Sequence, residues 1–241
     1  MGVLAIFGSE SDEAIFQPLM EKLKEKGLEA RLEVCSAHRQ PEKLKGILEK
    51  AKEKIVIAGA GLSAALPGFV ASHSDKLVIG LPVKANYSGL DALLSVHQMP
   101  KGFAVLGVGV DAIGEAANAA ELAEKGRQKI VLIKPQENGE AEKRFEACKK
   151  TLESLNAKFE EKEEDSYKDK SAIYIDFIAL ETVESVDPEG QLVIFVPVKE
   201  GSDKQDALKL AGLATKGIWV GLGRGDNAAI AAEKILKMGG R

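Results

Sequence analysis

An internal repeat places the strongest constraint on how this chain folds. Residues 77–84, LVIGLPVK, return as LVIFVPVK at 192–199, and residues 3–6 correspond to 130–133. In the same register residues 91–93 (DAL) match 206–208 and residues 101–102 (KG) match 216–217, and after a shortened loop residues 118–120 (NAA) match 227–229. Self-similarity of this kind predicts two homologous units, which we assign to residues 1–126 and 127–241.

Within the first unit, short apolar runs alternate with longer charged segments. The apolar runs at 3–7, 30–34, 55–58 and 77–81 predict strands. Helical spacing predicts helices at 13–26 and 41–53, and the second opens on Pro41, which suits a first helical turn. Alternation of strands and helices implies a parallel sheet with helices on both faces. We therefore expect an α/β fold of two tandem units with parallel sheets.

Composition excludes several classes of function. The net charge is −4 with interspersed signs, so no basic face predicts binding to nucleic acid and no cationic amphipathic helix predicts binding to a membrane. The apolar amino terminus lacks a basic leader and is followed at once by polar residues 8–12, so it reads as a strand. Only Cys35 and Cys148 are present, too few for a disulfide framework or a metal knot. A cytoplasmic protein is expected.

The loops at the ends of the predicted strands are the candidate ligand site, because ligands of parallel α/β folds gather at the carboxyl ends of the strands. Residues 8–12 (GSESD) join a strand to a helix, where free N–H groups favour an anion such as a sugar phosphate. Ser9 and Ser11 would add donors, whereas Asp12 would accept hydrogen bonds from ribose hydroxyls. The alternative is that Ser11 or Asp12 only caps the helix.

Residues 36–41 (SAHRQP) form the second such loop. Arg39 offers a planar fork that matches a phosphate, and its alternative is a surface salt bridge. His38 can exchange a proton near neutral pH. For His73 and His97, solvation or packing is the simpler interpretation, and Cys35 has no orienting partner that would favour a thiol nucleophile.

Residues 59–64 (GAGLSA) resemble a loose dinucleotide fingerprint, which makes a nicotinamide or flavin enzyme the rival reading. No acidic residue ends the next strand, where it would bind a ribose. The glycines then serve another purpose, such as close approach of the backbone to a small ligand.

In combination these segments resemble the PurE family of purine biosynthesis, which comprises N5-carboxyaminoimidazole ribonucleotide mutases and aminoimidazole ribonucleotide carboxylases. The resemblance rests on five motifs in the family's order and spacing: GSESD at 8–12, SAHRQP at 36–41, ALPG at 65–68, LSVHQMP at 94–100 and AANAA at 116–120. They cover the first unit, and the second resembles the family only through the repeat.

The resemblance implies a flavodoxin-like three-layer α/β/α sandwich, a ribonucleotide substrate with carbon dioxide, and no metal or organic cofactor. It implies that His38 is the general acid and base of a decarboxylation and recarboxylation. The loop 58–68 would supply backbone N–H groups to the migrating carboxylate, and residues 82–89 and 95–100 would close the remaining sides. The implied substrate-binding residues are Gly8, Ser9, Ser11, Asp12, Ser36, Ala37, Arg39, Ala58, Gly59, Ala60, Gly61 and Leu66.

One position departs from the family pattern. Mutases usually carry histidine where this chain has Ala65, whereas carboxylases lack it but tend to carry lysine where this chain has Arg39. We therefore prefer the mutase slightly over direct carboxylation by carbon dioxide. A non-catalytic nucleotide-binding protein is the third interpretation. The presence of His38 together with Ser9, Asp12 and Arg39 argues against it.

The second unit differs where chemistry is expected. All three histidines lie in the first unit, and the second has residues 134–139 (KPQENG) and an acidic run at 160–170 in place of the first two loops. We expect it to be a scaffold without a site of its own. The family forms octamers, so a fused pair implies a homo-oligomer, a tetramer with pseudo-octameric arrangement.

Overall fold

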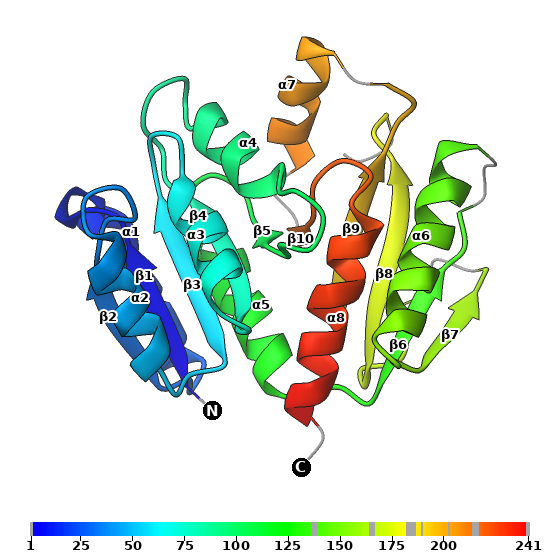
Figure 1. Ribbon diagram of the computed structural model, residues 1–241, viewed down its shortest axis with the longest axis horizontal. Coiled ribbons are helices and arrows are strands. Elements are labelled where there is room, and N and C mark those ends of the chain that lie inside the picture. Colours follow the sequence, from blue (N-terminus) through cyan, green and yellow to red (C-terminus); the bar gives the residue numbers. More distant parts are fainter. Residues whose placement is uncertain are drawn as a thin grey trace.

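The computed structural model describes residues 2–135, 139–163, 167–181, 187–188, 190–201, 203–213 and 217–239. Its secondary structure alternates strands with helices except that β7, β8 and β9 follow one another directly in the described residues (Figure 1). The first half contains β1 (Val3–Phe7), η1 (Glu10–Asp12), α1 (Glu13–Glu25), β2 (Ala30–Val34), α2 (Pro41–Lys50), β3 (Ile55–Ala60), α3 (Ala65–His73), β4 (Leu77–Pro82), α4 (Leu90–His97), β5 (Leu106–Gly107) and α5 (Ile113–Glu124). The second contains β6 (Lys129–Ile133), α6 (Glu140–Ser154), β7 (Phe159–Lys162), β8 (Ala172–Ala179), β9 (Leu192–Val198), α7 (Lys204–Leu213), β10 (Ile218–Trp219) and α8 (Gly225–Gly239).

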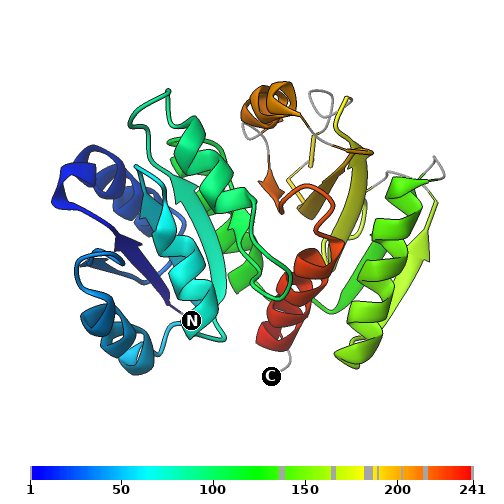
Figure 2. The ribbon, with the colours of Figure 1, turned by 45° about the horizontal axis from the view of Figure 1, so that its top comes forward.

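All ten strands belong to one sheet, in the order β2-β1-β3-β4-β5-β10-β9-β8-β6-β7. Each half therefore has the order 2-1-3-4-5 of flavodoxin-like folds, counted from its own first strand. Pairing within each half is parallel, and one antiparallel pair, Gly107 with Trp219, joins the halves. The expectation of a parallel α/β fold is confirmed, and the two half-sheets are continuous. Figure 2 shows the halves as two lobes of one molecule.

The strands are almost wholly apolar because both faces of the sheet are covered. β1, β3, β4 and β9 are buried at every position, and β8 is buried at every position except its last, Ala179. The outermost strands differ: β2 and β7 have no fully buried position and carry charges, which suits unprotected edges. α5 packs against α8, and α4 against α7, so the halves meet through helices as well as through the sheet.

Backbone hydrogen bonds show which positions of the two halves correspond. Asp111 N donates to Pro82 O and Ala116 N to Ala112 O, and the same bonds recur from Gly223 to Pro197 and from Ala228 to Arg224. In this correspondence Asn227 lies opposite Glu115. The predicted match of Asn118 with Asn227 is therefore wrong by one helical turn: Asn118 is exposed, whereas Asn227 is 1% exposed.

Asn227 instead ties the halves together. Its side chain accepts from Gly102 N at 3.0 Å and donates to Pro100 O at 3.0 Å and Phe103 O at 3.3 Å. Because buried backbone groups need partners, these bonds fix the segment between α4 and β5 against the start of α8.

Candidate active site

The first loop, which follows β1, is shaped by a serine cap. Ser9 Oγ accepts from Ser11 N at 3.2 Å and from Ser11 Oγ at 2.8 Å. Ser9 thus takes the capping role that the sequence left to Ser11 or Asp12, and Asp12 makes no side-chain cap bond at the start of α1. Burial raises the pKa of Asp12, and the nearby Asp111 raises it further. Asp12 and Asp111 are therefore near enough for their charges to repel each other.

The second loop is held against the first by Arg39. Arg39 N donates to Ser36 Oγ at 3.3 Å, and Arg39 Nη2 donates to Gly8 O at 3.4 Å. His38 lies in the turn between them and is exposed, and Ala37 is half-buried against the apolar core. Within the described residues no carboxylate lies within ion-pair distance of Arg39, so its alternative as a surface salt bridge has no support. The structure brings the loops containing Gly8 and His38 together.

Cys35, at the base of this loop, is 1% exposed, and its Sγ lies 3.7 Å from Gln40 O. Burial raises the pKa of its thiol. A raised pKa disfavours the thiolate, in agreement with the expectation that Cys35 is no nucleophile.

The third loop leaves β3, and its glycines have steric reasons. A Cβ on Gly59 would come 2.2 Å from Cε1 of the Phe7 ring, so only glycine fits beneath that ring. Ser63 has φ +50°, and its N–H donates to Asp91 Oδ2 at 3.0 Å. Asp91 Oδ1 is buried with no hydrogen-bond partner. The loop is thus strained and held from below by α4, as is common at functional sites.

Several residues assigned to substrate binding lie inside the protein. Ala58 is 0% and Leu66 2% exposed, and both side chains pack in the core between the sheet and α3. Gly59 and Ala60 are buried in β3, and Gly61 is half-buried at the start of the loop. Of this set, contact with a ligand would involve backbone atoms of residues 59–61.

Two further loops complete the edge, and they contain residues that sequence reasoning missed. Asp111, at φ +55°, accepts from Lys84 N at 2.9 Å and donates its own N–H to Pro82 O. Tyr87 and Ser88 also have positive φ, and the Tyr87 side chain is 81% exposed. Lys84 and Asp91 were visible as parts of the repeated segments 77–84 and 91–93, but no sequence pattern singled out Asp111.

The remaining wall differs from its expected role. His97 is 5% exposed, and its Nδ1 bonds Leu93 O at 2.9 Å, while its ring fills the space beside Gly107. Burial lowers the pKa of His97 to about 4. Packing, one of the two explanations offered by the sequence, therefore accounts for His97. His73 is exposed, stacks on Phe69 and bonds Ser72 and Phe69 O.

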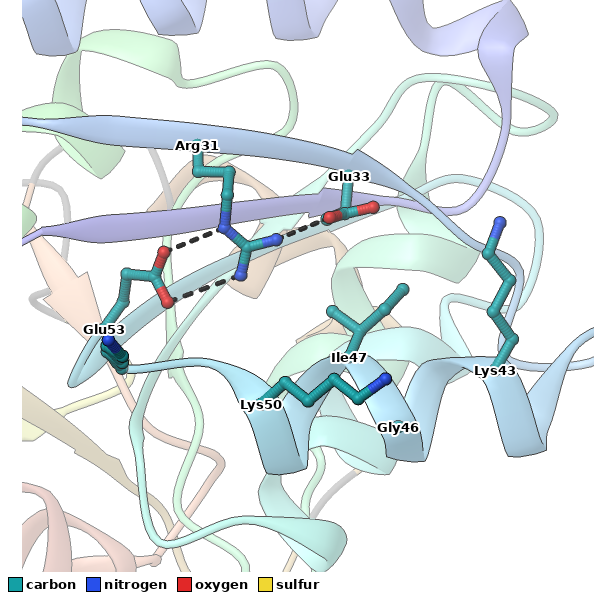
Figure 3. Close-up of a pocket in the computed structure, with 8 residues that line it drawn as sticks. Arg31, Glu33, Lys43, Gly46, Ile47, Lys50 and Glu53 are labelled. Atoms are coloured by element: carbon teal, nitrogen blue, oxygen red, sulfur yellow. Dashed lines mark hydrogen bonds and ion pairs between the residues drawn. The ribbon is translucent and has the colours of Figure 1, made fainter.

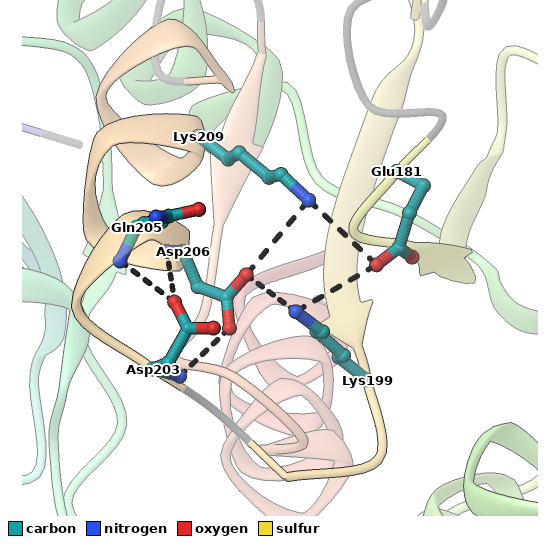
Figure 4. A network of polar contacts seen from close by, with 6 residues as sticks. All are labelled: Glu181, Lys199, Asp203, Gln205, Asp206 and Lys209. Atoms are coloured by element: carbon teal, nitrogen blue, oxygen red, sulfur yellow. Dashed lines mark hydrogen bonds and ion pairs between the residues drawn. The ribbon is translucent and has the colours of Figure 1, made fainter.

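The corresponding loops of the second half are occupied by ion pairs. Lys199 Nζ lies 2.6 Å from Asp206 Oδ1 and 3.9 Å from Glu181 Oε1, and Lys209 bridges the same two carboxylates (Figure 4). Lys84, which corresponds to Lys199 in the repeat, has no ion-pair partner in the described part of the chain. The acidic run is also paired, since Glu161 meets Lys134 and Lys149. Residues 136–138 and 164–166, part of the segments compared above, lie outside the described residues.

A separate cavity of about 500 Å³ lies beside the edge strand β2 (Figure 3). Arg31 reaches Glu33 at 2.5 Å and Glu53 at 2.9 Å there. Because both carboxylates are already used by one guanidinium, this cavity is an ion-pair surface rather than part of the loop cluster. The described residues hold no cluster of histidine, cysteine and acidic side chains suited to a metal, and no described helix has the length and apolarity to span a membrane.

The comparison with protein families decides the ancestry of these loops. The model of the AIR carboxylase family matches residues 2–151, which include every loop described for the first half. The chain belongs to the AIR carboxylase family. The match ends within α6, beyond the boundary expected near residue 126.

Curated relatives in the AIR carboxylase family bear the name N5-carboxyaminoimidazole ribonucleotide mutase. One from Methanocaldococcus jannaschii is 49% identical over 121 residues, which are 50% of this chain and 75% of the relative. One from Saccharolobus solfataricus is 44% identical over 125 residues, 50% of this chain and 77% of the relative. Among solved structures, Treponema denticola PurE is 28% identical with a TM-score of 0.43, covering 49% of this chain and 76% of that one.

Proposed function

We propose that this protein is an N5-carboxyaminoimidazole ribonucleotide mutase of purine biosynthesis. The observation that carries the proposal is the loop pair 8–12 and 36–39, which the family match includes and which Arg39 holds together through Gly8 O. An exposed imidazole next to an unpaired guanidinium is suited to a substrate that needs both proton transfer and phosphate binding. The relatives carry this activity in their names.

In this proposal Ser9, Asp12 and Arg39 bind the ribose phosphate end. Phosphate oxygens accept from the free N–H groups of the first loop, from Ser9 and from the Arg39 fork. Asp12, whose pKa is raised by burial, accepts a hydrogen bond from a ribose hydroxyl. Ser11, Ser36 and Ala37 shape the two loops around these groups.

His38 carries the proton chemistry. The carbamate C–N bond breaks and releases carbon dioxide, the ring carbon attacks it to form a C–C bond, and His38 takes the proton that this carbon loses and returns it to the amine. Backbone N–H groups of residues 59–61 stabilise the carboxylate as it moves. Carbon dioxide must be kept from water, so the loops have to close over it.

The need to close the site over carbon dioxide supports our proposal that the protein is a homo-oligomer, a tetramer of two-unit chains. Leu62 is 62% and Tyr87 81% exposed at the rim of the loop cluster, and apolar side chains of this size are commonly covered in an assembly. Light scattering should find a tetramer. A stable monomer with full activity would contradict this part.

We also propose that residues 127–241 are a degenerate copy of the first unit with a structural role in the cytoplasmic enzyme. The shared strand order and the recurring backbone hydrogen bonds support common ancestry. The paired state of Lys199 supports the loss of the site. Ribonucleotide bound among residues 134–170 in a crystal would overturn the structural role.

Direct carboxylation of aminoimidazole ribonucleotide is the second candidate, because Ala65 begins α3 where mutases usually have histidine. Purified protein should be given each substrate separately, with and without bicarbonate, and formation of the carboxylated imidazole followed. The mutase converts the carbamate without bicarbonate and incorporates no labelled bicarbonate. Turnover that needs bicarbonate and starts from the uncarboxylated ribonucleotide would favour the carboxylase, and binding without turnover of either would favour the non-catalytic reading.

A further inference from the structure

Arg127, at the junction of the two halves, is a buried cation that has almost no partners. It is 7% exposed, and its Nη1 donates a hydrogen bond to Gly126 O at 2.7 Å. Its Nε is buried with no partner, and no carboxylate lies within ion-pair distance among the described residues. A guanidinium has five N–H donors and stays charged, so a buried one with a single carbonyl partner has unused capacity for an anion.

Arg127 lines a cavity of about 850 Å³ at the base of the second half. The cavity lies where α6 and α8 end and β6 and β7 begin. Figure 1 shows these ends of the four elements on the side of the molecule where the chain ends. Its residues come from the second half and from the junction, whereas the candidate active site is formed by loops 8–12 and 36–39 of the first. The cavity is therefore separate from the candidate active site.

The first half shows how this corner is closed when no ligand is needed. There Lys26, at the end of α1, lies 2.7 Å from Glu121 of α5, and Glu121 also pairs with Lys125. Glu233 and Lys237 repeat the pair of Glu121 and Lys125 in α8. The position of Lys26, however, is taken by Leu155, as the matching turn hydrogen bonds at the two helix ends show.

That replacement removes a cation that would fill the corner and leaves an apolar wall. Leu155, Phe159 and Leu236 are among the residues that line the cavity. Of its other cations, Lys129 is paired with Glu160 and Asp169, and Lys237 with Glu233, whereas Lys158 has no ion-pair partner in the described part of the chain. The two carboxylates that line the cavity, Glu160 and Glu233, are paired with lysines. The positive charges of Arg127 and Lys158 therefore have no carboxylate partner among the described residues.

The helix ends explain only part of this arrangement. Carbonyl groups at the ends of α6 and α8 favour nearby cations, which suits exposed Lys158 and Lys237. The side chain of Arg127 donates instead to Gly126 O, and its Nε has no partner. An arginine fork matches a phosphate, and the apolar wall matches a flat ring.

We propose that this cavity binds a nucleoside monophosphate, with the phosphate on Arg127 and Lys158 and the base against Phe159 and Leu236. Its volume falls within the range typical of small-molecule sites. The proposal does not depend on the chemistry assigned to His38.

The test is titration calorimetry with adenosine monophosphate on the full chain carrying Arg39→Ala, which weakens phosphate binding at the candidate active site. We expect binding to one site per chain, about tenfold weaker when Arg127→Gln is added and several-fold weaker with Lys158→Ala. Adenosine and inorganic phosphate should each bind at least tenfold more weakly than the monophosphate. Affinity unchanged by both Arg127→Gln and Lys158→Ala, or no binding at millimolar concentration in the Arg39→Ala background, would overturn the proposal.

Two further measurements keep the test decisive even if the Arg127→Gln variant misfolds. Lys158 is exposed, so its alanine variant should retain the wild-type circular dichroism spectrum even if Arg127→Gln does not. Crystals soaked with adenosine monophosphate should place its phosphate within hydrogen-bond distance of Arg127. A phosphate bound only among residues 8–39 contradicts the second site.

Discussion

At the carboxyl ends of the strands, the first half leaves Arg39 and Lys84 without carboxylate partners in the described residues, whereas the second half holds Lys199 between Asp206 and Glu181. The strand order behind these loops is the same. A phosphate is attracted by charge that is not already neutralised, so the same scaffold favours an anion in one half and disfavours it in the other. The difference lies in a few side chains at the edge rather than in the fold.

The packing between the halves follows the same contrast. Gly107 and Trp219 occupy corresponding positions in β5 and β10 and pair with each other. In the first half the ring of His97 fills the space beside Gly107. In the second half the strand residue at the corresponding position, Trp219, supplies a buried indole ring of its own. A titratable ring is thus used as core in one half only, which gives that half a pH dependence.

The largest expected effect tests whether the chemistry belongs to the first half alone. His38→Asn should lower turnover of the carbamate by about 10²–10⁴-fold, because a positioned general acid and base contributes that much, with ribonucleotide affinity nearly unchanged. Steady-state kinetics and calorimetry measure the two. His73→Asn, on the exposed end of α3, is the matched control and should keep full turnover. If His38→Asn turns over normally, the role assigned to this imidazole is wrong.

The second prediction concerns His97 and pH. Its folded-state pKa of about 4 lies below the ordinary 6.5, so the unfolded chain binds the extra proton as the pH falls between these values. Stability present above pH 6.5 is therefore lost on acidification, by about 3 kcal/mol when the pH reaches 4. Urea unfolding at pH 7 and pH 4 should show that His97→Leu escapes this loss. His73→Leu should follow the wild type, and parallel curves for all three proteins would show that His97 is not the titrating group.

Much of the fold follows from the sequence because it depends on local pattern. Pro41 opens α2 and the run 30–34 is β2, both as predicted, since apolar periodicity and helix-start signals act within a few residues. The order 2-1-3-4-5 is found in both halves of the sheet. The joining of the half-sheets at Gly107 and Trp219 could not be predicted, because it depends on tertiary packing of two-residue strands.

The site was less accessible for a related reason. The motifs identified the loops, but their contacts depend on residues far apart in sequence, such as Arg39 with Gly8 and Ser63 with Asp91. Asp111 carries no motif, and its importance comes from a left-handed backbone and its bond to Lys84 N. No sequence pattern points to Arg127, because an unpaired buried cation can be recognised only when the burial of its side chain is known.

The third prediction separates two asparagines that the sequence aligned. Asn227→Ala removes three hydrogen bonds and leaves Gly102 N and two carbonyls without that partner, so we expect the free energy of unfolding to fall by about 1–3 kcal/mol. Amide exchange at Gly102 should accelerate in parallel. Asn118→Ala, the matched control on an exposed face of α5, should change stability by less than about 0.5 kcal/mol. Equal losses for the two variants would restore the sequence alignment and contradict the one drawn from backbone hydrogen bonds.

The smallest effect sharpens the contrast between Lys84 and Lys199. Lys84→Met removes an unpaired cation next to the loop of Asp111, and an exposed charge contact contributes about 1 kcal/mol, so the KM for the ribonucleotide should rise about fivefold with little change in kcat. This rise should shrink as salt is added, because exposed charges are screened. Lys199→Met removes a lysine already neutralised by Asp206, so KM and its salt dependence should stay at wild-type values. A salt-sensitive rise in KM for Lys199→Met, with none for Lys84→Met, would show that the second half, and not the first, supplies the cation that the substrate meets.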